Sequence, residues 1–325
     1  MDEFGLIARY FAPLAAGEPG AFGLTDDAAV LDLAPGTRLV VTTDALVAGV
    51  HFLADDPPAE IARKLMRVNL SDLAAMGARP RGVLLDAVLP RSTTESWLAE
   101  FSRGLAGDVA EFAAPLVGGD TVATDGPLTL VLTALGTVDR RGALLRSGAK
   151  VGEDIYVSGT IGDGALGLKA LRGEIKGLDA VSRDALVARY RVPQPRVGLG
   201  PLLVGIAGAC MDVSDGLIGD LGHICDCSGV GARITAAAVP VSAAARRVLV
   251  RDPALLTAVL TGGDDYELLF TAPAAARDAV AGAARSAGVP VARIGMVVEG
   301  RGVEVSDAQV LGLTFSRGGY SHFQE

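Results

Sequence analysis

Short runs of apolar and β-branched residues recur through the first half of the chain, and each run is bounded by Gly, Pro or Asp. Runs of this kind are typical of strands that are buried in a sheet. Four strands are predicted, at residues 38–44, 83–89, 127–138 and 154–159. Between them, apolar residues recur at helical spacing over residues 60–77 and 96–112, as in helices that bury one face. Because strands and helices alternate, the pattern predicts a mixed α/β fold class.

The chain has 325 residues, and at about 100–200 residues per domain this length predicts two domains. The polar, Gly-containing segment at residues 146–154 lies between two predicted strands. We place the boundary there, which gives domains 1–148 and 149–325. A second break falls at residues 192–196, where two prolines interrupt a helix because they remove amide donors and restrict the residues before them.

The composition favours a globular protein and argues against binding of nucleic acid. Half of the residues are apolar and 21% are charged, which is typical of a globular chain. The net charge of −9 provides no basic field for a nucleic-acid backbone, so an acidic protein that handles phosphates must recruit metal cations. The N-terminus is acidic where a signal peptide needs positive charge, and the longest nearly apolar run, residues 128–138, is too short to cross a bilayer. We expect a soluble, cytoplasmic protein.

The three cysteines are expected to be reduced and structural. Their odd number and the length of the chain do not fit a disulfide framework. Cys225 and Cys227 are separated by one residue rather than the two to four of a zinc knuckle, and no second pair completes four ligands.

Aspartates recur beside Gly, Ser or Thr, at the predicted ends of strands or starts of helices. Each position alone has a structural interpretation, because turns and N-caps favour such residues. Asp44 and Asp120 stand out because each follows an apolar or Gly-containing run, and both are expected where a strand leaves the core and meets a cleft. The aspartates concerned are Asp26, Asp27, Asp44, Asp72, Asp120, Asp212, Asp215, Asp264 and Asp265.

Carboxylates gathered in one cleft repel one another unless cations bind there, and their hard oxygens suit Mg²⁺. Such a magnesium cluster would receive polyphosphate and supply the charge stabilisation that phosphoryl transfer requires. The phosphate-binding pattern Gly-x-x-x-x-Gly-Lys-Ser/Thr is absent. Residues 162–167 do fit Gly-x-Gly-x-x-Gly between a predicted strand and a predicted helix, so a Rossmann-type dinucleotide site is the alternative. That alternative leaves the aspartates unexplained.

Several of these motifs, in register along almost the whole chain, resemble the thiamine-monophosphate kinase family. The motifs are Thr-Thr-Asp44-Ala-Leu-Val-Ala-Gly-Val-His51-Phe, Asn69-Leu-Ser-Asp72-Leu, Gly118-Gly-Asp120-Thr, Arg146-Ser-Gly-Ala, Asp212-Val-Ser-Asp215-Gly-Leu, Gly262-Gly-Asp264-Asp-Tyr-Glu-Leu and Gly319-Tyr320-Ser-His-Phe. The resemblance implies an ATP-dependent kinase that phosphorylates thiamine monophosphate in thiamine diphosphate biosynthesis, with Mg²⁺ as cofactor.

The wider superfamily is similar to aminoimidazole ribonucleotide synthetase and selenophosphate synthetase. It implies an N-terminal α/β domain that forms a homodimer through its sheet, and a C-terminal α/β domain that closes over the nucleotide. Those two activities are the alternatives within the superfamily. A selenophosphate synthetase needs a Cys or selenocysteine near its N-terminus, and no cysteine precedes Cys210 here.

The resemblance also implies roles for individual residues. Thr25 stands where relatives usually carry Gly, and a β-branched residue would be strained there if its φ were positive. By resemblance, the magnesium ligands are Asp26, Thr42, Thr43, Asp44, Asp72, Asp120, Asp212 and Asp215. The residues expected to contact ATP are Gly119, Asp120, Arg146 and Ser214, and those expected to contact thiamine monophosphate are His51, Asp264 and Tyr320.

The chemistry of these side chains agrees with such roles. The guanidinium of Arg146 would bind phosphate oxygens bidentately. Asn69 and Asp72 are one helical turn apart, so both are expected to face the cleft. Asp264 suits the cationic thiamine, and Tyr320 offers a ring to pack against it. The expected reaction is a direct in-line transfer, in which an already ionised phosphate oxygen attacks and no protein base is needed.

Overall fold

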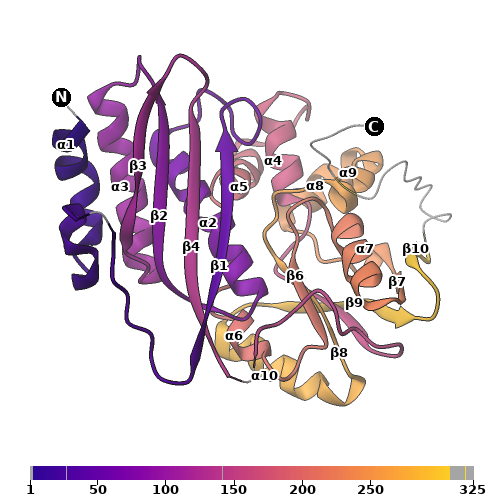
Figure 1. Ribbon diagram of the computed structural model, residues 1–325. Coiled ribbons are helices and arrows are strands. Elements are labelled where there is room, and N and C mark those ends of the chain that lie inside the picture. The colour runs from indigo at the N-terminus through magenta and orange to yellow at the C-terminus, as the bar shows by residue number, and fades with distance from the viewer. Residues whose placement is uncertain (1–2, 27, 141, 308–318, 320–325) are drawn as a thin grey trace. The chain divides into compact units, whose positions relative to one another are not determined.

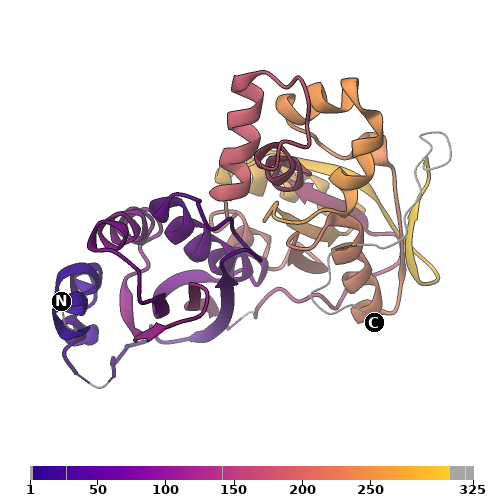
Figure 2. The same ribbon diagram turned by 90° about the horizontal axis from the view of Figure 1, so that it is seen from above.

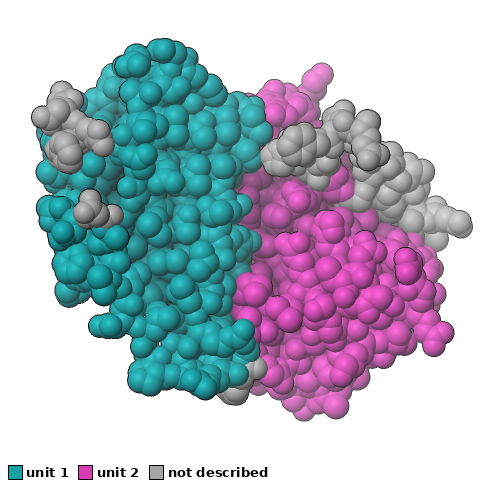
Figure 3. Space-filling model, in the orientation of Figure 1, with its two compact units in different colours: residues 1–73, 78–142 teal, residues 74–77, 143–325 magenta. Residues whose placement is uncertain are grey.

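The computed structural model of the chain describes residues 3–26, 28–140, 142–307 and 319. The described chain forms two compact units, which Figure 3 colours separately. Unit 1 contains residues 1–73 and 78–142, and unit 2 contains residues 74–77 and 143–325. The boundary predicted after residue 148 lies close to this division and stays a prediction.

Unit 1 is built on a four-stranded sheet of order β1-β4-β2-β3. Its strands are β1 (Thr37–Val47), β2 (Arg79–Pro90), β3 (Leu116–Thr124) and β4 (Thr129–Asp139). β4 is antiparallel to both β1 and β2, while β2 and β3 are parallel. Three of the strands match predicted runs: β1 and β2 are longer than predicted, and β4 lies within two residues of its predicted bounds.

Two long helices cover one face of this sheet, as seen from above in Figure 2. They are α2 (Pro58–Ala75) and α3 (Glu95–Phe112), close to the two helices that the periodicity predicts. The hydroxyl of Thr94 accepts a hydrogen bond from the amide of Trp97 at 3.2 Å and so begins α3. Ala113 ends the helix in the left-handed conformation. Against this layer, Leu130, Leu132 and other alternate residues of β4 are completely buried.

The N-terminal segment covers part of the opposite face of the sheet. It contains α1 (Glu3–Leu6) and the short helical turns η1 (Ile7–Phe11), η2 (Ala12–Ala15) and η3 (Pro19–Leu24). Ala15 and Ala21 of this segment pack with Val117 of β3. Elsewhere the face is open, because Leu39 and Val41 of β1 are 47% and 56% exposed. We call the face of the sheet opposite α2 and α3 the open face.

The backbone at Thr25 is not strained. Its φ is −111°, within the range that β-branched residues adopt without difficulty. The left-handed conformations of this turn fall earlier, at Phe22, Gly23 and Leu24. The condition under which Thr25 would be strained, a positive φ, is therefore not met in this chain.

Unit 2 is built on a six-stranded sheet of order β10-β7-β9-β5-β8-β6. Its strands are β5 (Asp154–Ser158), β6 (Ala209–Asp212), β7 (Gly231–Ile234), β8 (Leu268–Ala272), β9 (Val291–Val298) and β10 (Gly302–Val305). All described pairs are antiparallel except β10 with β7. The two units together have the mixed α/β class that the alternating pattern predicts.

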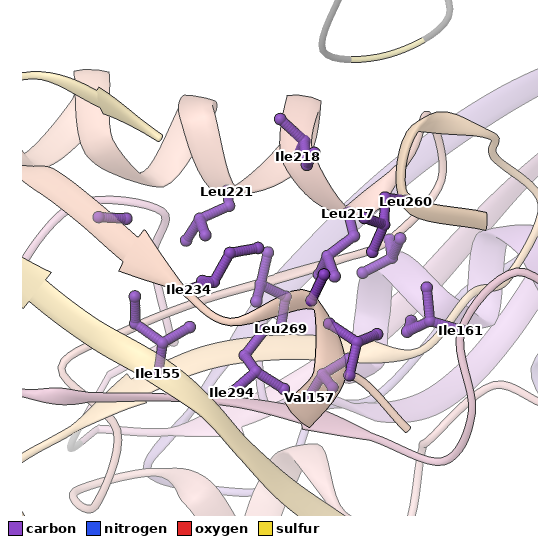
Figure 4. Close-up of a cluster of buried hydrophobic side chains, with 14 of the residues drawn as sticks. Ile155, Val157, Ile161, Leu217, Ile218, Leu221, Ile234, Leu260, Leu269 and Ile294 are labelled. Atoms are coloured by element: carbon purple, nitrogen blue, oxygen red, sulfur yellow. The ribbon is translucent and has the colours of Figure 1, made fainter. Parts of the chain in front are cut away.

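Helices cover both faces of the second sheet (Figure 1). One layer contains α4 (Asp163–Leu171), α5 (Ala180–Arg191), α7 (Leu217–Ser228), α8 (Ala243–Arg251) and α9 (Leu256–Thr261). Its core joins Ile155 and Leu269 of the sheet to Leu221 of α7, as Figure 4 shows. The other layer contains α6 (Gly200–Leu203) and α10 (Arg277–Ala287), which pack on Tyr156 and Phe270. Helix α5 ends before the Pro193–Pro195 break, as predicted.

No helix in the described ranges is long and apolar enough to cross a membrane. The three cysteines are unpaired, with Cys210 and Cys225 buried and Cys227 exposed. Burial raises the pKa of the Cys225 thiol to about 11. A buried thiol with a raised pKa is an inert, structural group, which agrees with the sequence-based expectation for Cys225.

Candidate functional site

One group of oxygen-bearing side chains lies on the face of the first sheet that α2 covers. Thr42 and Asp44 lie opposite Ala134 and Leu132 of β4, and both partners are completely buried. Side chains directly opposite each other share a face of the sheet, so Thr42 and Asp44 are on the helix-covered face. There the Thr42 hydroxyl donates a hydrogen bond of 2.5 Å to a carboxylate oxygen of Asp72. We call Thr42, Asp44 and Asp72 the helix-face group.

His51 lies in the turn after β1, and the backbone fixes its ring. The amide of Val47 donates to His51 Nδ1 at 3.0 Å, so this nitrogen is an acceptor and Nε2 carries the ring proton. The ammonium of Lys64, a buried residue of α2, donates to the carbonyl oxygen of His51 at 3.0 Å. The sequence analysis missed Lys64, although Lys64 and Asp72 lie on one stripe of α2 at successive i, i+4 steps.

Asn69 differs from its prediction. It does not face an open cleft, because its side chain is completely buried and its Nδ2 donates to the carbonyl oxygen of Leu65 at 3.0 Å. Its Oδ1 is a buried oxygen that has no hydrogen-bond partner in the part of the chain that the structure describes. A buried acceptor of this kind, one helical turn before Asp72, calls for a water molecule, a donor or a cation.

A second group lies on the open face. Asp120 of β3 pairs with Asp86 of β2, and Asp86 lies opposite Val131, which alternates with the buried residues of β4. One hollow on this face, with a volume of about 480 Å³, is lined by both carboxylates and also by Asp26 and Gly119. We call Asp26, Asp86 and Asp120 the open-face group. The sequence analysis missed Asp86, which falls inside a predicted strand.

Glycine is required at position 119 because β2 approaches closely. A Cβ there would lie 1.9 Å from the carbonyl oxygen of Leu85, and φ is +147°. Thr43 also lies on the open face, since its hydroxyl accepts a hydrogen bond of 3.0 Å from that of Thr133. Thr42 and Thr43 therefore point to opposite faces of β1, as neighbours in a strand must.

Two expectations need correction, namely that Asp44 and Asp120 lie at strand ends and that they gather in one cleft of the chain. Asp44 and Asp120 do not lie at strand ends, because β1 continues to Val47 and β3 to Thr124. The strand order also separates them, with β1 at one edge of the sheet and β3 at the other. Among the described residues, no three His, Cys, Asp or Glu side chains of one chain lie close enough together to hold a metal ion. The acidic residues of unit 1 thus form two separate groups.

In unit 2, the loop between β6 and α7 is folded around the buried carboxylate of Asp220. One oxygen of Asp220 accepts the amides of Ser214, Asp215 and Gly216 at 3.0, 3.1 and 3.1 Å. Burial, followed by the charge of Asp215, raises the pKa of Asp220 to about 7. Because Asp220 takes these three amides, the loop cannot offer them to phosphate, and its remaining chemistry lies in side chains such as Asp215. The sequence analysis missed Asp220, although it follows Gly219 and fits the pattern of aspartates beside glycine.

A second loop of unit 2, residues 262–267, is bonded to the first. The amide of Asp264 donates to the carbonyl oxygen of Ser214 at 2.9 Å, and that of Tyr266 donates to Val213 at 2.8 Å. Asp264 and Tyr266 have φ values of +70° and +52°. Such conformations cost of order 1–3 kcal/mol for a residue other than Gly, so the surrounding structure must impose them.

The buried carboxylate of Asp265 imposes part of this conformation. It accepts the amides of Gly162 and Gly164 at 2.7 and 3.0 Å. Burial raises the pKa of Asp265 well above its usual range, despite these two hydrogen bonds. These are the amides that a Rossmann site would offer to a pyrophosphate, and both sheet neighbours of β5 are antiparallel. The dinucleotide-binding alternative is therefore wrong.

Glu267 anchors the other end of the loop. Its completely buried carboxylate forms ion pairs with Arg189, at 2.9 Å, and with Arg196. It also accepts a hydrogen bond of 2.6 Å from the hydroxyl of Ser158. Two guanidinium groups and a hydroxyl satisfy the buried charge, as burial of a carboxylate requires. Alternate residues of the loop are thus fixed in the interior while Asp264 and Tyr266 are only partly buried.

Arg146 lies outside the groups and loops described above. Arg146 is exposed near the start of the unit 2 segment. The Ser228 hydroxyl of α7 accepts the amides of Gly148 and Ala149, each at 3.2 Å, and so holds the segment that follows Arg146. Tyr320 and Asp27 lie outside the described residues.

Family models and known proteins match most of the chain. The model of the AIR synthase related protein N-terminal domain matches residues 25–138, and that of the C-terminal domain matches residues 150–308. A thiamine-monophosphate kinase of Caulobacter vibrioides is 46% identical over 93% of this chain and 85% of its own length. The Escherichia coli K12 thiamine-monophosphate kinase is 43% identical over 99% of this chain and 98% of its own length.

Solved structures give the same result. The thiamine-monophosphate kinase of Stenotrophomonas maltophilia is similar at a TM-score of 0.84 and 41% identity, over 92% of this chain and 96% of that chain. AaThiL complexed with AMPPCP and TMP is similar at a TM-score of 0.78 and 30% identity, over 94% of this chain and 98% of that chain.

Proposed function

The chain belongs to the thiamine-monophosphate kinase family, and from this premise we propose that it transfers the γ-phosphoryl group of ATP to thiamine monophosphate. The products are thiamine diphosphate and ADP. The observation that carries the proposal is the match to curated kinases along nearly the whole of both chains. A relative that binds an ATP analogue together with TMP supports the same pair of substrates.

Magnesium is the cation that suits the donor set. Hydroxyl and carboxylate oxygens are hard ligands, and the buried Asn69 Oδ1 beside Asp72 is a further oxygen in need of a partner. When bound, Mg²⁺ neutralises phosphate charge. At an effective dielectric near 20, unit charges about 4 Å apart repel by roughly 4 kcal/mol, so carboxylates alone would exclude ATP. The proposed ligands are Asp26, Thr42, Thr43, Asp44, Asp72, Asp120, Asp212 and Asp215.

The two substrates are assigned to different parts of the site. Gly119, Asp120, Arg146 and Ser214 are proposed to contact ATP. His51, Asp264 and Tyr320 are proposed to contact thiamine monophosphate, with His51 donating through Nε2, since Nδ1 accepts the Val47 amide. The attacking phosphate oxygen is already ionised near neutral pH. The role of the chain is therefore to orient two anionic substrates for in-line transfer rather than to remove a proton.

A homodimer would bring the acidic groups of unit 1 together. The two groups lie on opposite faces of one sheet, and Asp44 of the first and Asp120 of the second are on its opposite edge strands. A second copy docked on the open face would place one chain's open-face group near the edge of the other chain's sheet. The exposed Leu39, Val41 and Val122 support an apolar interface there. We infer that the magnesium ligands of unit 1 come from both copies of the chain.

Release of ADP upon addition of thiamine monophosphate tests the proposed reaction. The purified chain with Mg²⁺ and ATP should release ADP only when thiamine monophosphate is present, and thiamine diphosphate should form in equal amount. Selenide and the linear precursor of aminoimidazole ribonucleotide serve as controls for the other activities of the superfamily. ADP release with either control substrate, and none with thiamine monophosphate, would contradict the proposal.

A further inference from the structure

The loop at residues 262–267 has two partly buried residues, Asp264 and Tyr266, in strained backbone conformations. Asp264 and Tyr266 both adopt left-handed backbone conformations, which glycine adopts without cost. The motif already carries Gly262 and Gly263, yet side chains are kept at the two strained positions. Strained residues that the surroundings fix firmly are typical of ligand sites.

The anchors of this loop show which way its side chains face. Asp265 is bonded to the amides at the start of α4, and Glu267 is paired with two arginines. Both carboxylates are completely buried, whereas Asp264 and Tyr266 are partly exposed. A Cβ at Gly164 would lie 2.8 Å from Cβ of Asp264, so α4 supports the loop closely from one side. The loop therefore presents Asp264 and Tyr266 together, on a rigid base.

The two presented side chains also contact each other. The hydroxyl of Tyr266 lies 3.4 Å from Oδ1 of Asp264. A phenol beside a carboxylate combines an electron-rich ring face with a negative charge, and both attract a cation. Thiamine monophosphate carries a permanent positive charge on its thiazolium ring, which makes it a suitable partner for such a pair.

We propose that Tyr266 is a specificity-determining residue for the substrate, acting together with Asp264 to recognise its cationic ring. The Tyr266 ring packs on the cationic part of thiamine monophosphate, and its hydroxyl orients the Asp264 carboxylate. This inference rests on the proposed function. It gives a role to Tyr266, a residue of the quoted motif to which the resemblance assigns none.

Kinetics of three Tyr266 variants test the proposal. Tyr266→Leu removes the ring and should raise the KM for thiamine monophosphate about tenfold, while the KM for ATP stays within about twofold. Tyr266→Phe removes only the hydroxyl and should have a smaller effect, about threefold. Tyr266→Trp keeps an aromatic face and should restore most of the affinity that Leu loses.

Tyr156 provides a matched control in the same unit. Its hydroxyl lies 3.3 Å from a carboxylate oxygen of Asp154, and its ring packs in the core next to Phe270. Tyr156→Phe therefore removes a similar contact outside the site, and should leave both KM values unchanged. A substrate analogue whose thiazolium is replaced by a neutral ring provides a second control, because the Leu variant should bind it nearly as well as the wild type does.

The outcomes separate this inference from the proposed function. If the wild type does not phosphorylate thiamine monophosphate, the proposed function fails. If the wild type is active and Tyr266→Leu leaves the KM for thiamine monophosphate unchanged, the role of Tyr266 is refuted. An equal rise in both KM values, with a lower melting temperature and no rescue by Trp, would also overturn the role, since it would show that Tyr266 only supports the fold.

Discussion

The backbone amide of Asp264 donates a hydrogen bond of 2.9 Å to the carbonyl oxygen of Ser214. This bond joins the loop proposed to contact thiamine monophosphate to the loop proposed to contact ATP. Because it connects main chain to main chain, it does not depend on the identity of either side chain. Substitutions in one loop should therefore change the binding of one substrate without altering the spacing between the two loops.

Asp44→Asn and Asp120→Asn should each lower kcat by at least about a hundredfold while leaving the melting temperature within a few degrees of the wild type. Removal of one group that stabilises phosphoryl charge typically costs this much. Asp125→Asn is the matched control, because Asp125 is an exposed carboxylate just after β3 that pairs with Arg91 at 3.1 Å and belongs to neither acidic group. Steady-state kinetics and thermal unfolding check the result, and near-normal turnover in either Asn variant would remove that residue from the site.

Asp220→Leu should destabilise the loop that follows Asp212 and carries Asp215. Its carboxylate accepts three amides, and each buried amide left without a partner costs about 1–3 kcal/mol. Asp220→Asn keeps one acceptor oxygen and should recover part of this stability. Because the loop carries the proposed ligand Asp215, the Mg²⁺ concentration needed for half-maximal activity should rise in the order wild type, Asn, Leu. An unchanged magnesium requirement in a folded Leu variant would show that Asp220 does not position the loop.

Asp265 should make the stability of the protein depend on pH. Burial, its largest cause, raises the pKa of the carboxyl in the folded chain, against the opposing effects of the Gly162 and Gly164 amides; Asp163 raises it further and Arg189 lowers it. The folded state then binds the proton more tightly than the unfolded state, whose Asp pKa is about 3.9. The contribution of Asp265 is therefore fully present below that value and is lost as the pH rises through the folded pKa.

Urea unfolding of the wild type and Asp265→Asn between about pH 4 and pH 8 measures this contribution. Asn keeps an acceptor oxygen but does not ionise, so the wild type should lose stability relative to the variant as the pH rises. The account of Asp265 would be contradicted if the free energy of unfolding of the wild type, relative to that of Asp265→Asn, stayed constant or increased as the pH rises.

Val41→Glu should disrupt the proposed homodimer. Val41 is 56% exposed on the open face, and two like charges brought together at a symmetric interface would repel each other. Sedimentation velocity should show a dimer for the wild type and a monomer for the variant. Val250→Glu is the control, since Val250 is 78% exposed on α8 of unit 2. A wild-type monomer, or a variant that remains dimeric, would refute an interface at this face.

Local pattern was enough to predict much of the fold. The apolar spacing at residues 60–77 and 96–112 predicts helices that the structure places at Pro58–Ala75 and Glu95–Phe112. Strand β3 was harder to predict because Gly118 and Gly119 weaken its strand pattern. Its place in the sheet depends on hydrogen bonds to β2 rather than on its own composition.

The site was predictable only in part. The pattern of aspartates beside glycine identifies side chains able to bind cations, but it does not tell which face of a strand each one takes. It also cannot separate carboxylates that are partly exposed from buried carboxylates that hold a loop in place. Asp264 and Asp265 are neighbours in sequence, yet Asp265 is buried because it bonds to the amide of Gly162, 103 residues away. Such long-range pairs, like that of Glu267 with Arg189, arise only in the folded chain.

The most direct test of the account is the activity of a purified heterodimer that carries Asp44→Asn on one chain and Asp120→Asn on the other. If each site combines the helix-face group of one copy with the open-face group of its partner, one site contains both substitutions and the other contains neither. We predict about half of the wild-type activity from the heterodimer, although both parent homodimers are inactive. A heterodimer as inactive as its parents would contradict a site shared between two copies of the chain.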